Sequence, residues 1–238
     1  MAAPSIADNF ARVREHIARA AERSGRRVEE ITVVAVSKTF PAEAIRAAHA
    51  AGLRHFGENR IQEWEGKQAH LGSLDDATWH LIGHLQSNKA RRAVRLFHTV
   101  DSVDSMELAQ KLDSAAAELD KRLRVLIEVR LDPAASKTGV AEEDAPKLVQ
   151  AILKLAHLDL RGLMGIPPYF EDAEKVRPYF RRLRDLRSNL RLSLRLSLRH
   201  ALPELSMGMS HDFEVAVEEG ATQLRLGTAL FGERALAK

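Results

Sequence analysis

The stretch Ile31-Thr-Val-Val-Ala-Val-Ser-Lys38 is a short apolar run, rich in β-branched residues, that ends on a single lysine. β-Branched side chains favour an extended strand. Because nearly every position is apolar, and not every second one, the strand is expected to be buried on both faces, as in a parallel sheet covered by helices. Ser37 and Lys38 would then lie at the carboxyl end of the strand, where parallel α/β folds bind their ligands.

Lys38 has two interpretations at this point. A lysine amine in apolar surroundings loses part of the hydration that stabilises its charged form, and it can then act as a nucleophile toward a carbonyl. Alternatively, the side chain only leads from the sheet into solvent. The choice depends on which other residues reach the same end of the sheet.

Seven further apolar runs follow, each with helical sequence after it, at residues 53–56, 79–82, 97–100, 124–129, 158–163, 204–206 and 223–226. Strands that alternate with helices predict a parallel sheet, and eight such units in 238 residues predict an α/β fold of the closed (β/α)₈ TIM barrel type. An amphipathic extra helix over residues 5–23 precedes the first strand. The sequence has no linker or shift in composition, so we expect one domain over residues 1–238.

The segment Leu190-Arg-Leu-Ser-Leu-Arg-Leu-Ser-Leu-Arg199 does not fit this pattern. Leucine at every second position is the period of a strand. The barrel needs only the end of a helix and a loop here. An added strand, a continuation of the preceding helix and a disordered basic insertion are all open.

Composition narrows the classes of function. Hydrophobic residues make up 45% and charged residues 29%, which is ordinary for a soluble globular protein. A net charge of +3 permits an anionic small ligand, and the sequence lacks the basic-aromatic interleaving that binds nucleic acid. The absence of cysteine excludes disulfides and thiolate metal sites and fits a cytoplasmic location. We expect a monomer with no signal peptide, no membrane span and no nucleic-acid partner.

The last two predicted strands end in sequences that suit an anion. Met207-Gly-Met-Ser210 and Arg225-Leu-Gly-Thr228 each offer a glycine for close backbone approach, a hydroxyl and the start of a following helix. TIM barrels frequently bind phosphate at these strands. Together with Lys38, the two loops indicate a phosphorylated aldehyde or ketone as the ligand.

Two other groups of residues are ambiguous. Arg225 stands in an otherwise apolar strand, where it makes either an outward ion pair or an inward contact with the ligand. His80, His84 and His98 lie near two neighbouring strands. No carboxylate or cysteine at ligand spacing accompanies them, so we expect no metal.

Six different short motifs are spread over nearly the whole chain. In order they are Ala35-Val-Ser-Lys38, Phe56-Gly-Glu-Asn59, Trp79-His-Leu-Ile-Gly83 with Leu85-Gln-Ser-Asn-Lys89, Gly162-Leu-Met164, Leu205-Ser-Met-Gly-Met-Ser210, and Arg225-Leu-Gly-Thr228 with Phe231-Gly232. With these motifs the sequence closely resembles the pyridoxal phosphate homeostasis protein family, whose members look like a lone N-terminal barrel of alanine racemase. The Leu-Arg-Leu-Ser repeat departs from the family pattern.

The resemblance implies a barrel that holds pyridoxal 5′-phosphate (PLP). The cofactor-binding residues that it implies are Lys38, Asn59, Met164, Ser206, Gly208, Ser210, Arg225, Gly227 and Thr228. Lys38 matches the Schiff-base lysine, Arg225 matches the arginine that faces the pyridine nitrogen, and Asn59 matches a residue near the ring. The phosphate-binding positions are matched by Ser210, Gly227 and Thr228. Lys89 and Lys137 are open as a second, transient PLP site.

The resemblance also implies a role in vitamin B6 and amino-acid homeostasis, with PLP-dependent apoenzymes as partners and no established turnover. An arginine at the pyridine nitrogen leaves the ring unprotonated, which makes the cofactor a poorer electron sink. The chain has only Tyr169 and Tyr179, and no second domain supplies the tyrosine that alanine racemase uses. The alternatives are a PLP-dependent racemase-like enzyme with Lys38 as its base, and a lysine-dependent aldolase that binds a sugar phosphate without cofactor.

Overall fold

The computed structural model describes residues 4–132, 138–195 and 202–233. Its eight strands form a closed parallel barrel in which each strand pairs with the next in chain order and the last returns to the first. The strands are β1 (Thr32–Val36), β2 (His55–Glu58), β3 (Thr78–Leu81), β4 (Thr99–Val103), β5 (Leu123–Arg130), β6 (Leu158–Ile166), β7 (Glu204–Ser206) and β8 (Gln223–Leu226). The predicted TIM barrel is confirmed.

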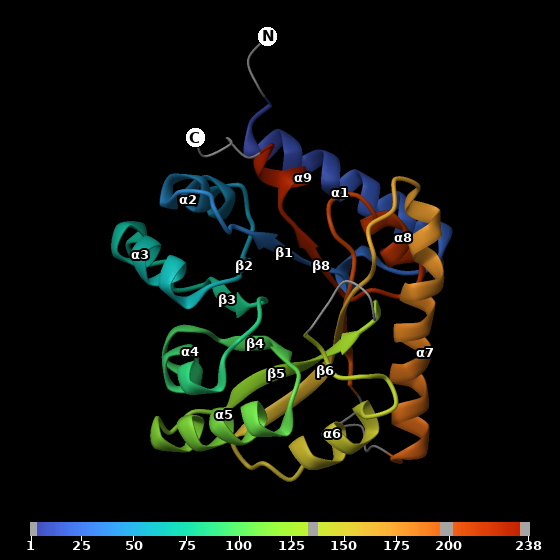
Figure 1. Ribbon diagram of the computed structural model, residues 1–238. Coiled ribbons are helices and arrows are strands. Elements are labelled where there is room, and N and C mark those ends of the chain that lie inside the picture. Colours follow the sequence, from blue (N-terminus) through green and yellow to red (C-terminus); the bar gives the residue numbers. More distant parts are fainter. Residues whose placement is uncertain (1–3, 133–137, 196–201, 234–238) are drawn as a thin grey trace.

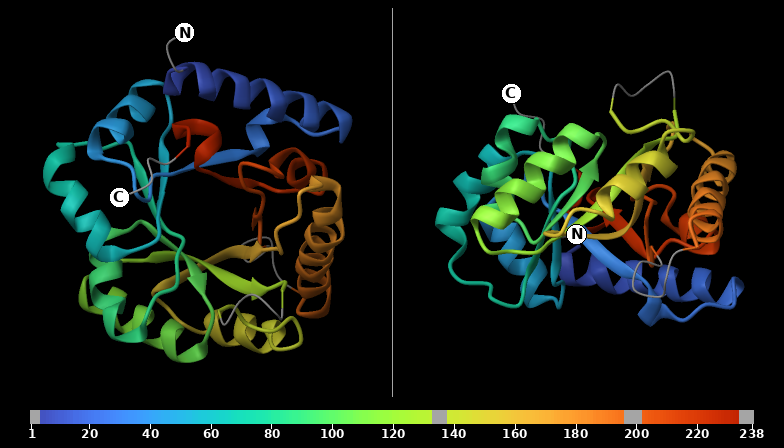
Figure 2. Two further views of the ribbon diagram at one scale, coloured as in Figure 1. Left: turned by 45° about the horizontal axis from the view of Figure 1, so that its top comes forward. Right: turned by 90° about the horizontal axis from the view of Figure 1, so that it is seen from below.

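Helices form a ring around the strands, as Figure 1 and the left view of Figure 2 show. They are α1 (Ile6–Arg23), α2 (Ala42–Ala50), α3 (Ile61–Leu71), α4 (Ala90–Leu96), α5 (Met106–Glu118), α6 (Ala145–Ile152), α7 (Arg177–Ser193), α8 (Phe213–Glu218) and α9 (Thr228–Phe231). Short 3₁₀ helices cover Val28–Glu30, Ser87–Lys89 and Ala173–Val176. None of the helices in the described ranges is long and apolar enough to cross a bilayer.

The hydrophobic core lies between the strands and the helices, because side chains alternate between the two sides of each strand. On the outer side, the rings of Phe56 and Trp79 stack with centroids 5.0 Å apart, and Trp64 of α3 lies 3.8 Å from Trp79. The inner side of the barrel carries buried polar residues as well as apolar ones. His80 Nδ1 lies 3.0 Å from Asp101 Oδ2, and both residues are buried.

The additional helix α1, near the start of the chain, packs against the last helices of the chain. It begins with a capping box between Ser5 and Asp8 and packs beside α8 and α9 (Figure 1). Asn9 Nδ2 donates to Leu230 O at 2.9 Å, and His16 Nδ1 lies 2.6 Å from Glu214 Oε1. The helix therefore supports the last βα unit of the barrel.

Gly162 is required by the closeness of two strands. It pairs in register with Glu204 across β6 and β7, and a Cβ at this position would overlap the Glu204 carbonyl. A larger residue would push the two strands apart.

The first four residues of the leucine repeat are helical, and the next two form a turn. α7 runs to Ser193, so the interpretation as a continued helix is correct for the first part of the segment. Leu190 is buried and Leu194 is half-buried one turn later, whereas Leu192 is 76% exposed. Residues 196–199 lie outside the described residues.

Some predicted strand boundaries are wrong. The predicted strand 53–56 is shifted to β2, so that Glu58 is its last residue, and 97–100 is shifted to β4, so that Asp101 and Ser102 lie within the strand. Both polar side chains are tolerated in β4 because Asp101 contacts His80 and Ser102 Oγ donates to Gly83 O at 2.7 Å. β6 also extends to Ile166, beyond the predicted end at residue 163.

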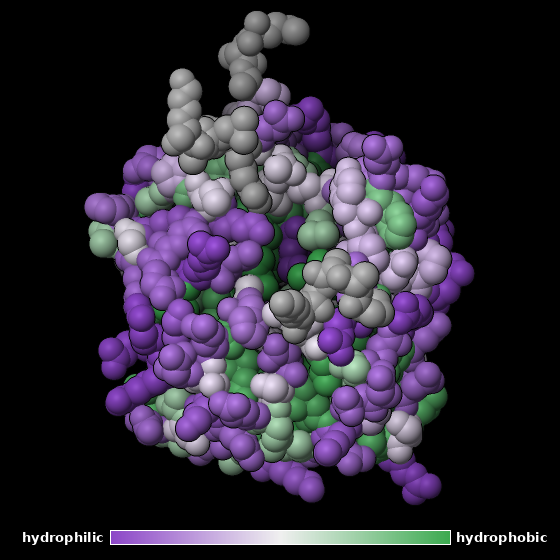
Figure 3. All heavy atoms as spheres, viewed as in Figure 1, coloured by the Kyte–Doolittle hydropathy of each residue, from purple (hydrophilic) through white to green (hydrophobic). Residues whose placement is uncertain are grey.

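Hydrophilic side chains cover most of the face seen in Figure 3. Hydrophobic residues show mainly in the hollows between them, as expected where the core between strands and helices comes close to the surface. The largest exposed hydrophobic residues among those described are Ile166, Tyr169 and Leu192.

Candidate functional site

The carboxyl end of β1 carries Lys38. β1 stops at Val36, and the next amide, that of Ser37, donates to Gly57 O of β2 at 3.0 Å. Lys38 follows at a half-buried position, and Thr39 has a φ of 69°. The lysine therefore projects from a tight turn at the end of the barrel where barrel enzymes bind their substrates.

The two predicted anion cradles form one structure. Ser210 Oγ, from the loop after β7, accepts hydrogen bonds from the backbone amides of Gly227 at 3.2 Å and Ala229 at 3.1 Å, in the loop after β8. Thr228 lies between those amides, and its side chain is exposed. One hydroxyl thus brings the loops together and leaves a second hydroxyl, that of Thr228, at the rim.

Gly208 shapes the first of these loops. Its φ is 91°, which side chains other than that of glycine rarely adopt, and a Cβ would come within 2.5 Å of the Ala216 Cβ. The Gly208 carbonyl accepts from the Arg225 amide at 3.0 Å. Gly208 therefore shapes the loop through its backbone conformation and its carbonyl hydrogen bond.

Arg225 points into the barrel, so the interpretation as an outward ion pair is wrong. Its Nη1 donates to Ser206 Oγ at 2.8 Å and its Nη2 to Gly165 O at 2.9 Å. Ser206 pairs in register with Met164 of β6, so Met164, Ser206 and Arg225 lie on three neighbouring strands. All three are buried.

The charge of Arg225 is balanced inside the barrel. Burial lowers the pKa of Arg225, and the carboxylates of Asp101, Asp212 and Glu128 oppose that shift. Burial also raises the pKa of Glu128 and Asp212. A guanidinium stays protonated in proteins, so it remains a hydrogen-bond donor and cannot become an acceptor.

Asn59 follows β2 and is half-buried. It lines a cavity of about 250 Å³ together with Arg60, His84 and Lys89. A Cβ at Gly83 would come within 2.4 Å of the Asn59 carbonyl oxygen, so the ends of β2 and β3 are close together. Lys89 is thus near Asn59, whereas Lys137 lies outside the described residues.

The predicted site residues lie on, or directly after, five consecutive strands, β6, β7, β8, β1 and β2. Hydrogen bonds or strand pairing join Met164, Ser206, Gly208 and Arg225, and Ser210 joins Gly227 and its neighbours. Lys38 is next to this set because β1 pairs with β8. Whether these residues contact a cofactor stays a prediction.

Sequence reasoning missed two groups. Asp101, within β4, and Glu128, within β5, face Arg225 from inside the barrel. Glu58, the last residue of β2, is fully buried and contacts Lys67 of α3. The sequence does contain a signal for the first group, because an acidic residue such as Glu128 in an otherwise apolar strand indicates a buried partner of opposite charge.

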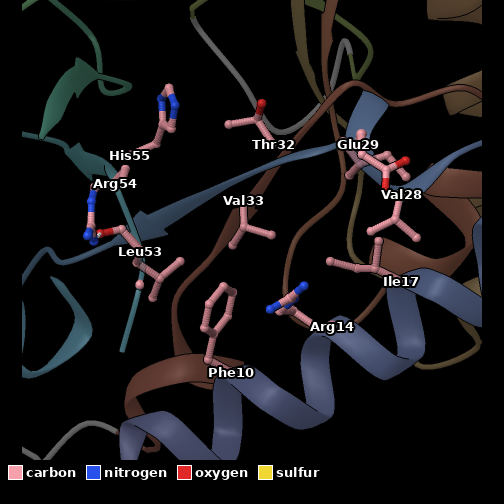
Figure 4. A pocket seen from close by; sticks show the side chains of 12 residues that line it. Phe10, Arg14, Ile17, Val28, Glu29, Thr32, Val33, Leu53, Arg54 and His55 are labelled. Atoms are coloured by element: carbon pink, nitrogen blue, oxygen red, sulfur yellow. Dashed lines mark hydrogen bonds between the residues drawn. The ribbon is translucent and has the colours of Figure 1, made fainter. Parts of the chain in front are cut away.

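Figure 4 shows a groove of about 330 Å³ at the other end of the barrel. Phe10 and Ile17 of α1 face it, as do Val33 at the start of β1 and Leu53 just before β2. These are the amino ends of the strands, so the groove is separate from the end that carries Lys38.

Comparison with known proteins shows what the chain is similar to. The family model described as alanine racemase, N-terminal domain, matches residues 5–235. A pyridoxal phosphate homeostasis protein of Pseudomonas aeruginosa is 46% identical over 230 residues, which cover 97% of this chain and 96% of the relative. The chain belongs to the pyridoxal phosphate homeostasis protein family. The resemblance seen in the six motifs is therefore confirmed.

Solved structures agree with this membership of the homeostasis protein family. PipY of Synechococcus elongatus, solved with PLP bound, has a TM-score of 0.85 and 42% identity, and the match covers 96% of this chain and 100% of PipY. An alanine racemase of Clostridium difficile has a TM-score of 0.66 at 15% identity, over 94% of this chain and 57% of the racemase. The latter match shows a shared fold alone.

Proposed function

We propose that this chain is a PLP-binding protein of vitamin B6 and amino-acid homeostasis that holds PLP as a Schiff base on Lys38. The observation that carries the proposal is the convergence of β7, β8 and β1. Three features lie at this end of the barrel. They are the hydrogen bond between the Gly227 amide and Ser210 Oγ, the buried Arg225 side chain, and the turn that carries Lys38. PLP binding by the relative PipY supports the same proposal.

The donors at this end fit the cofactor. The hydroxyls of Ser210 and Thr228 are suitable donors to a phosphate, and the amides of Gly227 and Ala229, which donate to Ser210 Oγ, hold the Ser210 hydroxyl in place. The Arg225 guanidinium would donate to a pyridine nitrogen that carries no proton. PLP supplies an aldehyde that a lysine amine can bond reversibly. We propose that Asn59, Met164, Ser206 and Gly208 complete the site.

We further propose that the protein carries PLP without turnover. Arg225 would keep the ring unprotonated and so limit carbanion stabilisation. Tyr169 is 74% exposed with its ring beside His211, and Tyr179 of α7 packs beside Phe170. Neither tyrosine comes from a second domain, as the racemase tyrosine does, which favours a carrier over a two-base racemase.

The proposal includes handover of PLP to apoenzymes by a monomeric, single-domain protein in the cytoplasm. An open barrel end would let the cofactor leave for such a partner. Mixing the PLP-loaded protein with a PLP-dependent apoenzyme, and measuring the activity regained beyond that from an equal amount of free PLP, tests this part.

The first experiment is the visible absorption spectrum of the purified protein before and after borohydride, followed by peptide mapping. We expect a yellow wild type that is bleached and labelled at Lys38, and a colourless Lys38→Ala variant. Lys111→Ala is the matched control, because it removes an exposed lysine of α5 that belongs to no part of the candidate site, and it should leave the colour and the label unchanged. A wild type that neither contains nor takes up PLP would contradict the proposal.

Turnover is tested by proton exchange at the α-carbon of amino acids in deuterated water. We expect no more exchange than free PLP gives at the same concentration. Sustained exchange that is lost in Lys38→Ala would instead establish the racemase-like alternative.

A further inference from the structure

A buried ion-pair cluster lies directly behind the turn that carries Lys38. Lys67 Nζ of α3 lies 2.8 Å from Ser37 O, 2.8 Å from Glu58 Oε1 and 2.7 Å from Glu63 Oε1. The Lys67 side chain is only 11% exposed and that of Glu58 is fully buried. We call Ser37, Glu58, Glu63 and Lys67 the Lys67 cluster.

The cluster holds the backbone on both sides of Lys38. On one side, the Ser37 carbonyl accepts from Lys67. On the other, the Thr39 amide donates to the Glu63 carboxylate. The Phe40 amide closes the turn onto Ser37 O at 3.0 Å.

The turn needs this support because its conformation is unfavourable. Thr39 has a left-handed φ of 69°, which costs free energy for a β-branched residue. Such conformations persist when surrounding contacts enforce them. Glu63 supplies the contact at the Thr39 amide, and Lys67 links Glu63 to the Ser37 carbonyl.

Burying the charges of the cluster costs free energy that the stability of the fold does not require. Burial raises the pKa of Glu58, while hydrogen bonds from Lys67 and Ser37 oppose that shift. For Glu63, burial acts in the same direction, but the hydrogen bonds from Lys67 and Thr39 prevail, and its pKa is lowered. One Glu58 oxygen, Oε2, is buried without a hydrogen-bond partner in the described part of the chain. Hydrophobic residues would fill this space without desolvating three charges.

We propose that the Lys67 cluster is a positioning device for Lys38. Lys67 and Glu63 are positioning residues that fix the turn so that the Lys38 amine is directed toward the cofactor before it binds. Fixing a reacting group in advance removes the cost of ordering it later. The inference rests on the proposed function, in which Lys38 bonds PLP.

The experiment uses a graded pair at Glu63, which is on the first turn of α3 with 27% of its side chain exposed. Glu63→Ala removes the acceptor for the Thr39 amide, whereas Glu63→Gln keeps an oxygen there. We expect Glu63→Ala to slow the appearance of the visible Schiff-base band, on mixing cofactor-free protein with PLP, about tenfold, the value of one charge-assisted hydrogen bond. Glu63→Gln should stay within about threefold of wild type.

The share of borohydride label at Lys38, measured by peptide mapping, is the second readout. We expect Glu63→Ala and Lys67→Met to lower this share and Glu63→Gln to retain it. Glu219→Ala is the matched control. Glu219 is a buried carboxylate, paired with Arg177, Arg181 and Arg184 in another part of the fold. Its loss should reduce stability without changing the rate or the share.

Circular dichroism first establishes which variants are folded at the assay temperature. If Glu63→Ala is unfolded, Glu63→Asp replaces it, because this shorter carboxylate keeps the charge but does not reach the Thr39 amide. Folded variants that bond PLP at the wild-type rate and with the wild-type share at Lys38 would overturn the inference. A wild type without label at Lys38 would instead refute the proposed function.

Discussion

Arg225 Nη1 donates to Ser206 Oγ at 2.8 Å inside the barrel, so β7 supplies the acceptor for a cation on β8. Ser206→Ala would leave this N–H buried without that acceptor. We expect a loss of about 2 kcal/mol in the free energy of unfolding, measured by urea titration without PLP. Ser102→Ala is the control, because its hydroxyl donates to the neutral Gly83 carbonyl, and it should cost about 1 kcal/mol. Equal losses in the two variants would contradict this view of Arg225.

Ser210 joins the loops after β7 and β8, so its hydroxyl should matter for the phosphate. Ser210→Ala removes the acceptor for the Gly227 and Ala229 amides as well as one phosphate donor. We expect the Kd for PLP to rise about tenfold, measured by equilibrium dialysis. Ser24→Ala removes a hydroxyl that donates to Ala20 O at the end of α1, and it should leave the Kd unchanged. Similar Kd values for Ser210→Ala and wild type would rule out this role of Ser210.

Two glycine substitutions should have opposite effects on stability. Gly162→Ala places a Cβ on the Glu204 carbonyl between β6 and β7, and it should cost at least about 3 kcal/mol in the free energy of unfolding. Gly66→Ala in α3 meets no atom within 4 Å and should stabilise the protein by up to about 1 kcal/mol. Urea titration of both variants tests the pair, and a tolerated Gly162→Ala would show that β6 and β7 can separate.

His55 should make stability depend on pH. Burial, followed by the charge of His80, lowers the pKa of His55 from 6.5 to about 4 in the folded protein. Between these values the unfolded chain takes up a proton that the folded chain does not, so stability falls as the pH falls from 6.5 toward 4. The slope from one such group is at most about 1.4 kcal/mol per pH unit, and partial exposure reduces it.

His55→Gln tests this assignment because glutamine does not titrate. Urea titrations from pH 7 to pH 4.5 should show a shallower loss of stability for His55→Gln than for wild type. Parallel curves would assign the pH dependence to other groups.

Much of the fold could be predicted from local patterns. The β-branched run before Lys38, the alternation of strands with helices and the helical period of residues 5–23 are local signals, and all three are confirmed. The extents of β2 and β4 could not be predicted, because polar residues such as Asp101 continue a strand only when a distant partner, here His80, satisfies them. The form of the leucine repeat was left open, because its period of two is that of a strand, whereas α7 continues into it, buries Leu190 and exposes Leu192.

The candidate site was predictable to a similar extent. Strand ends indicated Lys38, Ser210 and Gly227, because position along a parallel strand is visible in the sequence. The inward direction of Arg225 was not predictable, since it depends on acceptors from β6 and β7. The Lys67 cluster was also missed, because a lysine within a helix usually indicates a solvated surface.

The pairing of β1 with β8 has a consequence for how the protein matures. Val34 and Arg225 are in register, although nearly the whole chain separates them. During synthesis Lys38 emerges early, and the loops after β7 and β8 emerge late, so no shorter chain contains the complete candidate site. Such non-local pairing is slow, and a ligand that binds only the closed ring stabilises it by mass action. Cofactor capture would therefore mark the moment at which a newly made chain has closed its barrel, and cofactor supply would set how many chains are held in that state.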